Sequence, residues 1–392
     1  MNTTFCMAPW INLACNPDGS MILCCVASHE EEIPEEERMN IIVDNSGVKN
    51  EELEIGNVTN NSFEYLWNNE EMRDVRLNML RGNPLPQCIQ CYETESRGGF
   101  SQRMIYNQKY LKKHIDKVKN TKHDGSAEFS PVELDLRLTN TCNFKCRMCG
   151  PNLSSAWERE LGKDLPKIDL NKIYPQLESL YDNVEEVYFA GGEPLISDHH
   201  YEIVKNLNSN VRIRYNTNFS VLNDEIFDIW EKFNDVELFI SIDGVGKVGE
   251  FIRKGFDTKR FLNNWIKFRK RFPRMRVGFN MVVQALNAFH FSDAHEFLLE
   301  HNILNDSTAI NFTVLDHPEY LSISILDSET KKEVKDKLFK SKNISQYGEI
   351  LKAIDSDHSK YGQRFKAHCI GLDLMRNEDT IEIIPELHRL LK

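Results

Sequence analysis

From residue 131 onwards the sequence alternates between short apolar segments and helix-length amphipathic segments, and this alternation constrains the fold more than any other feature. The helix-length segments include 222–233 and 258–272. The apolar segments have the composition of β-strands and cover residues 132–138, 185–191, 211–218, 236–244, 275–283 and 309–315. Because strands separated by helical crossovers form parallel sheets, we expect an α/β fold. Six such units predict a partial (β/α)6 TIM-like barrel over 131–325, with functional loops at the C-terminal ends of its strands.

The rest of the chain divides into three further segments. Residues 1–110 are irregular and cysteine-rich, and we expect a small N-terminal domain there. Within it, residues 62–81 predict a helix that Gly82 ends. Residues 111–130 are polar and are expected to form a linker, or an exposed helix and a linker. Residues 326–392 predict a helical C-terminal extension.

Composition and charge exclude several classes of function. The formal net charge is −12, with 60 acidic against 48 basic residues, which argues against general nucleic-acid binding. The acidic segment 28–38 is expected to be a solvated loop. No apolar run approaches the roughly 18 residues needed to cross a bilayer. The first residues, MNTTFCMAPW, do not have the pattern of a secretory signal, so we expect a cytoplasmic protein with no membrane partner.

The chain has ten cysteines, and three of them lie within CNFKCRMC, directly after the first predicted strand. In a reducing compartment, clustered thiols bind metal more often than they form disulfides. Thiolates select zinc, copper(I) or iron–sulfur clusters, and a closed zinc site normally has four protein ligands. Cys142, Cys146 and Cys149 therefore fit a cubane cluster with one iron open to a small molecule. A zinc loop with a distant fourth ligand is the alternative.

The CxxxCxxC spacing of these cysteines resembles the signature of the radical S-adenosylmethionine (SAM) superfamily. The resemblance implies a [4Fe–4S] cluster whose open iron is chelated by the amino and carboxylate groups of SAM. It also implies that an electron from the reduced cluster cleaves SAM, and that the 5′-deoxyadenosyl radical abstracts a hydrogen atom from the substrate. An electron donor such as flavodoxin or ferredoxin is then an implied partner.

A second motif, FAGGEPLI, ends the second predicted strand. Gly191 and Gly192 permit close approach of the backbone, and Pro194 fixes the turn. Glu193 can accept a hydrogen bond from an ammonium group. The resemblance implies that this GGEP segment holds the amino group of SAM, and an ordinary turn is the alternative.

Two further motifs supply polar groups at strand ends. In FISIDGVG, the resemblance makes Ser241 a SAM contact, and Asp243 is equally well explained as a turn former. Arg253, in GEFIRKG, resembles the arginine that binds the SAM carboxylate in peptide-modifying members, and an exposed helix arginine is the alternative. In RYNTNFS, Asn216 and Asn218 are expected near SAM or substrate, unless they are ordinary strand-end residues.

The N-terminal segment holds a second constellation of thiols: Cys6, Cys24, Cys88 and Cys91. Four thiolates complete an iron–sulfur site, and Gly19 is placed for a tight turn between them. The order resembles the SPASM/twitch auxiliary-cluster module of radical SAM enzymes, although in many relatives this module follows the barrel. We prefer Cys24 to the adjacent Cys25 because of its spacing. Zinc is the alternative metal here.

These features together are typical of a radical SAM enzyme with an N-terminal auxiliary cluster. We assign no catalytic side chain, because the cofactors carry the chemistry. The leading expectation is modification of a peptide or protein side chain, by analogy with the maturases that carry SPASM/twitch modules. The alternatives are radical dehydrogenation or rearrangement of a small alcohol or sugar, and a non-catalytic metal-binding interaction protein.

Overall fold

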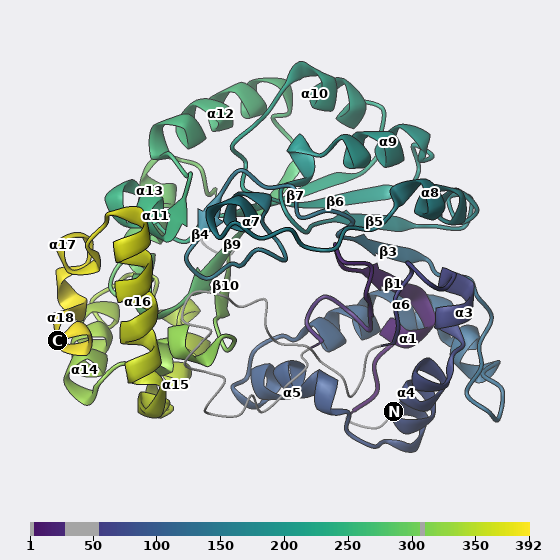
Figure 1. Ribbon diagram of the computed structural model, residues 1–392, viewed down its shortest axis with the longest axis horizontal. Helices are drawn as coiled ribbons and strands as arrows, with labels where there is room; N and C mark the ends of the chain where they lie inside the picture. Colours follow the sequence, from purple (N-terminus) through teal and green to yellow (C-terminus); the bar gives the residue numbers. More distant parts are fainter. Residues whose placement is uncertain (1–3, 28–54, 306–309) are drawn as a thin grey trace.

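An eight-stranded sheet forms the centre of the molecule, with the strand order β10-β9-β7-β6-β5-β3-β1-β2 (Figure 1). The computed structural model describes residues 4–27, 55–305 and 310–392, so the acidic segment 28–38 lies outside the described residues. The six predicted strands are all present and parallel: β3 (Glu133–Leu136), β5 (Glu186–Phe189), β6 (Arg212–Thr217), β7 (Val236–Ser241), β9 (Arg276–Val283) and β10 (Ile310–Val314). The predicted α/β class with a parallel sheet is confirmed.

The two faces of this sheet differ in chemistry. One face is covered by the crossover helices, which include α8 (Leu170–Glu178), α9 (Asp198–Asn206), α10 (Asp224–Trp230) and α12 (Thr258–Arg271) (Figure 1). In β6, alternate residues such as Ile213 and Tyr215 are buried. The alternate positions in between carry charged groups, and Arg214 Nη1 donates to Glu186 Oε1 over 2.9 Å. The period of two in the strand sequences reflects this division into an apolar and a polar face.

The N-terminal segment extends the sheet by two strands. Strand β1 (Asn12–Cys15) pairs in parallel with β3, and β2 (Met21–Ile22) pairs antiparallel with β1. The turn between β1 and β2 contains Gly19 at φ +87°, where a Cβ atom would lie 2.5 Å from Ile168 Cγ2. The predicted tight turn at this glycine is therefore present.

The predicted helix over 62–81 is wrong in one respect, because it is divided into α3 (Phe63–Trp67) and α4 (Glu70–Arg81). Asn69 begins α4 as its N-cap, with Oδ1 accepting a hydrogen bond from Met72 N over 3.0 Å. Gly82, at φ +83°, ends α4 as predicted. A local capping preference thus overrides the continuous helical pattern.

Helix α6 (Gln102–Lys119) connects the N-terminal cysteines to the sheet. Its side chains Tyr106 and Tyr110 are buried, and both hydroxyls donate to the carboxylate of Glu133 at the start of β3. Much of the polar segment that follows residue 111 is therefore a helix whose tyrosines pack against the first strand of the predicted barrel.

The C-terminal extension is helical, as predicted. It includes α14 (Ser328–Leu338), α15 (Gly348–Asp355), α16 (Gly362–Arg376), α17 (Thr380–Ile383) and α18 (His388–Leu391). These helices gather at the end of the sheet that carries β10, as Figure 1 shows in yellow and light green. Among the described residues, no helix combines the length and apolar character required to cross a membrane.

Candidate functional site

The loop with the three clustered cysteines follows β3 at the C-terminal edge of the sheet. Cys146 lies in the short strand β4 (Lys145–Cys146), which pairs antiparallel with β8 (Arg253–Lys254). This pairing puts Arg253 directly opposite Cys146. Burial, together with the charges of neighbouring thiols, raises the pKa of Cys142 and of Cys149 to about 12. Thiols in such surroundings stay protonated until a metal displaces the proton.

The start of helix α7 (Ser155–Glu160) fixes the shape of this loop. Trp157 is fully buried, and its Nε1 donates to the carbonyl of Cys146 over 2.8 Å. The backbone N–H of Cys142 donates to Ser155 Oγ over 3.1 Å. Residues at the start of α7 thus hold Cys142 and Cys146 in place through their backbones.

The C-terminal extension braces the same loop through Arg147, whose side chain is 0% exposed. Arg147 Nη2 donates to Asp373 Oδ1 over 2.8 Å and to Glu378 Oε2 over 2.7 Å. Its guanidinium lies 3.6 Å from the centre of the Phe251 ring. Its carbonyl accepts from His368 Nε2 over 3.1 Å. This contact between residue 147 and a helix more than 200 residues away was not predicted.

The GGEP loop after β5 runs against the residues that precede Cys142. Gly191 has φ +103°, and a Cβ atom on Gly192 would lie 2.2 Å from the carbonyl oxygen of Thr141. The backbone N–H of Glu193 donates to the same oxygen over 2.7 Å. Close backbone approach therefore explains the paired glycines, as predicted.

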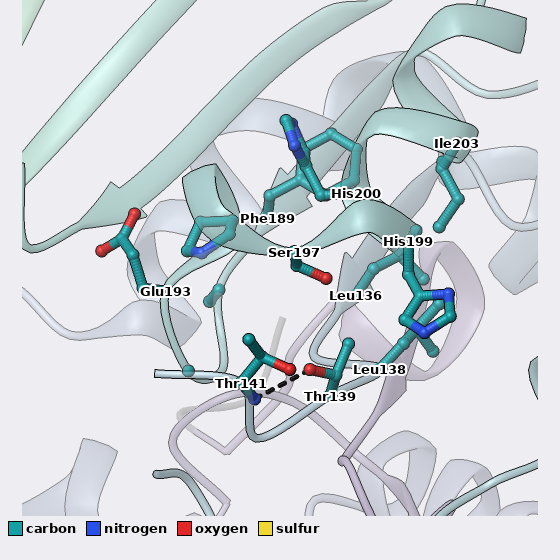
Figure 2. A pocket seen from close by; sticks show the side chains of 13 residues that line it. Leu136, Leu138, Thr139, Thr141, Phe189, Glu193, Ser197, His199, His200 and Ile203 are labelled. Atoms are coloured by element: carbon teal, nitrogen blue, oxygen red, sulfur yellow. Dashed lines mark hydrogen bonds between the residues drawn. The ribbon is translucent and has the colours of Figure 1, made fainter. Parts of the chain in front are cut away.

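A small cavity lies beneath this loop, with Thr139 and Thr141 on one side and His199 and His200 on another (Figure 2). Its volume is about 20 Å³. A space of this size holds about one water molecule and cannot hold a nucleotide. Figure 2 also shows that the carboxylate of Glu193 is directed away from it.

Glu193 is 1% exposed and binds the end of β6. Its carboxylate accepts from Thr217 Oγ1 over 2.7 Å, from the backbone of Asn218 over 2.6 Å and from the backbone of Leu195 over 3.1 Å. Burial raises the pKa of Glu193 to about 7, and these hydrogen bonds oppose the rise. A carboxylate offers about four acceptor positions, so one is left for a further donor. Pro194 begins the 3-10 turn Pro194–Ile196 that follows.

The two predicted asparagines at the end of β6, Asn216 within the strand and Asn218 just after it, have different partners. Asn218 Nδ2 donates over 3.0 Å to Asn143 Oδ1, which lies inside the cysteine loop. Asn216 Oδ1 accepts from Ser241 Oγ over 3.1 Å and from Asn280 Nδ2 over 3.2 Å. The structure thus brings Asn216 and Ser241 together on the polar face of the sheet, and Asn218 to the cysteines.

Sequence reasoning missed Asn280 and Asn311, which continue this polar row. Asn311 Nδ2 donates to Asn280 Oδ1 over 3.1 Å. The pairing of strands puts Ser241 beside Asn280 and Asn280 beside Asn311. The signal was available, because both asparagines are isolated polar residues within otherwise apolar strand segments.

Arg253 is a buried member of the site, with 11% of its side chain exposed, so the alternative of an exposed helix arginine is wrong. Its Nη1 donates to Asp243 Oδ2 over 2.7 Å, and Asp243 Oδ1 accepts from Val282 N over 2.8 Å. Burial by itself lowers the pKa of Arg253, but the thiol of Cys146 and the carboxylate of Asp243 outweigh it and raise the pKa. The Nε atom of Arg253 is buried without a hydrogen-bond partner. It is a donor that a bound carboxylate would satisfy.

The four N-terminal cysteines line a single enclosed cavity, together with Gln87, Arg103 and Tyr106. They come from three segments: Cys6 precedes α1 (Ala8–Ile11), Cys24 follows β2, and Cys88 and Cys91 lie at and after the start of α5 (Ile89–Ser96). Burial raises the pKa of each of the four thiols. Cys25 does not line this cavity; its charged neighbours are Asp135 and Arg137 on the polar face of the sheet.

The remaining cysteines lie apart from both groups. Cys15 is buried in β1, and Cys369 is buried in α16. All ten cysteines of the chain are free thiols in the structure.

The donor sets of the two cysteine groups fit iron–sulfur clusters. Among the residues that the structure describes, no three Cys, His, Asp or Glu side chains are arranged as ligands of one metal ion. Each thiolate of a cubane binds a different iron, so such thiolates lie farther apart than the ligands of a single zinc ion. The N-terminal cavity measures about 10 Å³, so its cysteine side chains must turn outward when a cluster enters.

Comparison with known families agrees with this chemistry. Residues 136–298 match the Radical SAM superfamily, and residues 6–92 match SPASM, an iron–sulfur cluster-binding domain. The chain thus contains a radical SAM domain and, before it in the sequence, a SPASM domain. The radical SAM domain implies a [4Fe–4S] cluster and SAM as cofactors, and the SPASM domain implies an auxiliary iron–sulfur cluster. No curated protein matches the chain.

Several solved structures are similar to parts of the chain at low sequence identity. Native anSMEcpe with bound AdoMet and Cp18Cys peptide is 15% identical, with a TM-score of 0.39 over 57% of this chain and 62% of that one. Streptococcus suis SuiB bound to S-adenosylmethionine is 15% identical, with a TM-score of 0.36 over 70% of this chain and 58% of that one. TYW1 with a lysine–pyruvate adduct bound is 13% identical, with a TM-score of 0.32 over 54% of this chain and 72% of that one. The chain thus covers less than two thirds of the first two structures.

Proposed function

We propose that this protein is an enzyme that cleaves SAM reductively at the Cys142 loop and uses the resulting radical to modify a peptide or protein side chain. The observation that carries the proposal is that three thiols share one site with a carboxylate and a guanidinium. The charges of Glu193 and Arg253 both act on the thiol of Cys142. The amino-acid part of SAM carries an ammonium and a carboxylate, which these two side chains complement.

The residues of the site divide the work of binding. Cys142, Cys146 and Cys149 would hold the cluster, which supplies, with SAM bound, the electron that releases the 5′-deoxyadenosyl radical. Glu193 has one acceptor position left for the ammonium group. Arg253 offers its unpartnered Nε to the carboxylate, while Asp243 fixes the orientation of the guanidinium.

The polar row on the sheet suits the nucleoside and the substrate. The Ser241 hydroxyl and the Asn216 amide lie at the ends of neighbouring strands, on the face that the crossover helices do not cover. Hydroxyl and amide groups in this position can hydrogen-bond ribose hydroxyls or peptide groups.

The N-terminal cavity is proposed as the auxiliary-cluster site. Its four cysteines, Cys6, Cys24, Cys88 and Cys91, provide a complete set of ligands, which leaves no iron open to a substrate. We propose a peptide substrate by analogy with the maturases that carry SPASM modules, because this chain has a SPASM domain at residues 6–92. A cytoplasmic setting with a flavodoxin- or ferredoxin-type donor would keep the thiols and clusters reduced.

Anaerobic assay of the reconstituted protein tests the proposal. With a strong reductant and SAM, wild-type protein should form 5′-deoxyadenosine, and Cys142→Ala should form none. An intact cluster that yields no 5′-deoxyadenosine would contradict the proposed activity.

The substrate class needs its own assay. A short peptide encoded beside the gene should change in mass and raise the yield of 5′-deoxyadenosine. A small alcohol or sugar that raises the yield in its place would contradict the peptide assignment and leave the SAM chemistry intact.

A further inference from the structure

We propose that Arg103 sets the reduction potential of the auxiliary cluster, and holds it higher than the four cysteines alone would. The inference rests on the proposed function in one respect, namely that the N-terminal cysteines bind an iron–sulfur cluster. Arg103 is a positioning residue in this account, because it acts on the cluster through its charge.

The guanidinium of Arg103 is fixed at the cavity by one contact with a backbone carbonyl and two contacts with a carboxylate. The residue lies in the first turn of α6 and lines the cavity of the four cysteines. Its Nη1 donates over 3.1 Å to the carbonyl of Phe5, the residue before Cys6. Its Nε donates to Glu95 Oε1 over 3.0 Å, and its Nη2 also contacts the Glu95 carboxylate. An arginine held by both edges keeps its charge in one place.

The pair formed by Arg103 and Glu95 is oriented with its positive end towards the cluster site. Arg103 lines the cavity and is 12% exposed, whereas Glu95 does not line it and is 22% exposed. The Glu95 carboxylate also accepts a hydrogen bond from Ser101 Oγ, so both Arg103 and Ser101 hold it in its position. The charge of Arg103 acts on Cys6 and Cys88 without an opposing contribution from Glu95, whereas both charges act on Cys91. Because only the guanidinium lines the cavity, its positive charge lies nearer to most of the cluster site than the carboxylate does.

The surroundings make the field of this charge strong. The other groups that line the cavity are mostly apolar and include Ala8, Leu23, Val26 and Met79. Charges interact more strongly in such a low-dielectric space than in water. Reduction adds an electron to a cluster that is already anionic, so a nearby cation stabilises the reduced form and raises the potential.

The same domain contains a matched control. Arg76 is fully buried, and its Nε donates to the carbonyl of Pro9 over 2.9 Å. It does not line the cavity of the four cysteines. Removal of this second arginine therefore perturbs the fold of the domain without removing a charge from the cluster site.

A redox titration followed by EPR tests the inference in a full-length variant that keeps only the auxiliary site, Cys142→Ala/Cys146→Ala/Cys149→Ala. In this background, Arg103→Gln should lower the potential, and Glu95→Gln should raise it. Arg103→Lys, which keeps the charge, should stay close to the parent, and Arg76→Gln should leave the potential unchanged. Iron and sulfide are quantified in each sample, so that only samples with a full cluster are compared.

The outcomes separate the inference from the proposal beneath it. If Arg103→Gln keeps its iron and the potential does not fall, the role of Arg103 is overturned and the auxiliary cluster stands. If Arg103→Gln loses its iron, the potential of Glu95→Gln tests the inference in its place. A potential above that of the parent variant supports the inference, and an unchanged or lower potential overturns it. If the parent variant holds no iron, or zinc only, the auxiliary-cluster assignment itself fails.

Discussion

The two cysteine sites of the protein are built in opposite ways. The proposed SAM site takes three thiols from one loop, residues 142–149, and surrounds them with charged and polar groups from several strand ends. The proposed auxiliary site takes four thiols from three separate segments and encloses them in a mostly apolar cavity. When one loop supplies all the cysteines, one side of the cluster site stays open to a ligand. When the cysteines come from several segments that converge, the protein surrounds the cluster site on all sides. The number of contributing segments therefore distinguishes the ligand-binding site from the enclosed site.

The two sites also use their arginines differently. Each has an arginine paired with a carboxylate, Arg253 with Asp243 and Arg103 with Glu95. Arg253 keeps a buried donor without a partner, which suits a ligand. Arg103 is bound on both of its edges, which suits a fixed charge. The following predictions test this contrast.

The largest effect is expected from replacing Cys142, Cys146 and Cys149 together by alanine. SAM cleavage should be abolished, and about half of the iron should be lost if the two clusters are of equal size. Iron and sulfide quantification measures the loss of iron, and an assay of 5′-deoxyadenosine formation measures the loss of SAM cleavage. Loss of all the iron would show that the two sites do not fill independently, against the contrast drawn here.

The next largest effect is expected from Arg147→Met, which removes the brace of the SAM loop. Breaking this buried ion pair leaves Asp373 without its ionic partner and Glu378 with Lys254 alone, and costs about 3–5 kcal/mol of unfolding free energy. Urea unfolding measures the loss, and iron should fall at the SAM site first. Arg389→Met is the control, because Arg389 forms exposed pairs and should cost less than about 1 kcal/mol. Equal losses of unfolding free energy in Arg147→Met and Arg389→Met would contradict the proposal that Arg147 stabilises the cysteine loop.

A smaller effect is expected from Gly192→Ala in the GGEP loop. The new methyl group meets backbone 2.2 Å away, so the loop must shift, at a cost of roughly 1–3 kcal/mol. SAM binding, measured by calorimetry on the reconstituted protein, should weaken as well. Gly348→Ala has open space around its Cβ position and should not destabilise the protein. A tolerated alanine at position 192 would mean that the close approach to Thr141 is not required.

The smallest effect is expected from mild acid. Burial lowers the pKa of His200 and of His368 to about 3, so both stay neutral in the folded state. The unfolded chain binds more protons below its histidine pKa, about 6.5, so stability is lost as pH falls through that value. Between pH 7.5 and 5.5 each histidine should cost about 1.4 kcal/mol. Urea unfolding at both pH values measures this, and the loss of stability between them should be smaller in His200→Gln than in the wild type by about 1.4 kcal/mol. If His200→Gln loses as much stability between pH 7.5 and 5.5 as the wild type does, His200 does not contribute to the acid sensitivity.

Local patterns in the sequence predicted much of the fold. Neighbouring residues determine hydrophobic periodicity and helix caps. The sequence therefore predicted the six parallel strands and helices such as α10, α12 and α14. Gly82 and the Gly191–Gly192 pair were predictable because their conformations exclude most other residues. The break at Asn69 was missed because one cap interrupts a pattern that otherwise continues.

Long-range partnerships could not be predicted from one sequence. The pairing of β1 with β3 joins strands that lie more than 100 residues apart. The contacts of Arg147 with α16 and of Arg103 with the carbonyl of Phe5 depend on tertiary packing, which no local pattern records. The residues that approach the SAM cysteines were predictable as motifs, and the groups that hold them in place, such as Asp243 beside Arg253, became visible only in the structure.

The most direct test of the central contrast is EPR of the two reduced, single-site variants with and without SAM. One variant carries alanine at Cys142, Cys146 and Cys149, and the other carries alanine at Cys6, Cys24, Cys88 and Cys91. We predict that SAM changes the spectrum of the variant that keeps the three-cysteine loop, and leaves the spectrum of the other unchanged. A spectrum of the intact three-cysteine cluster that does not respond to SAM, or a response from the four-cysteine site, would contradict the account.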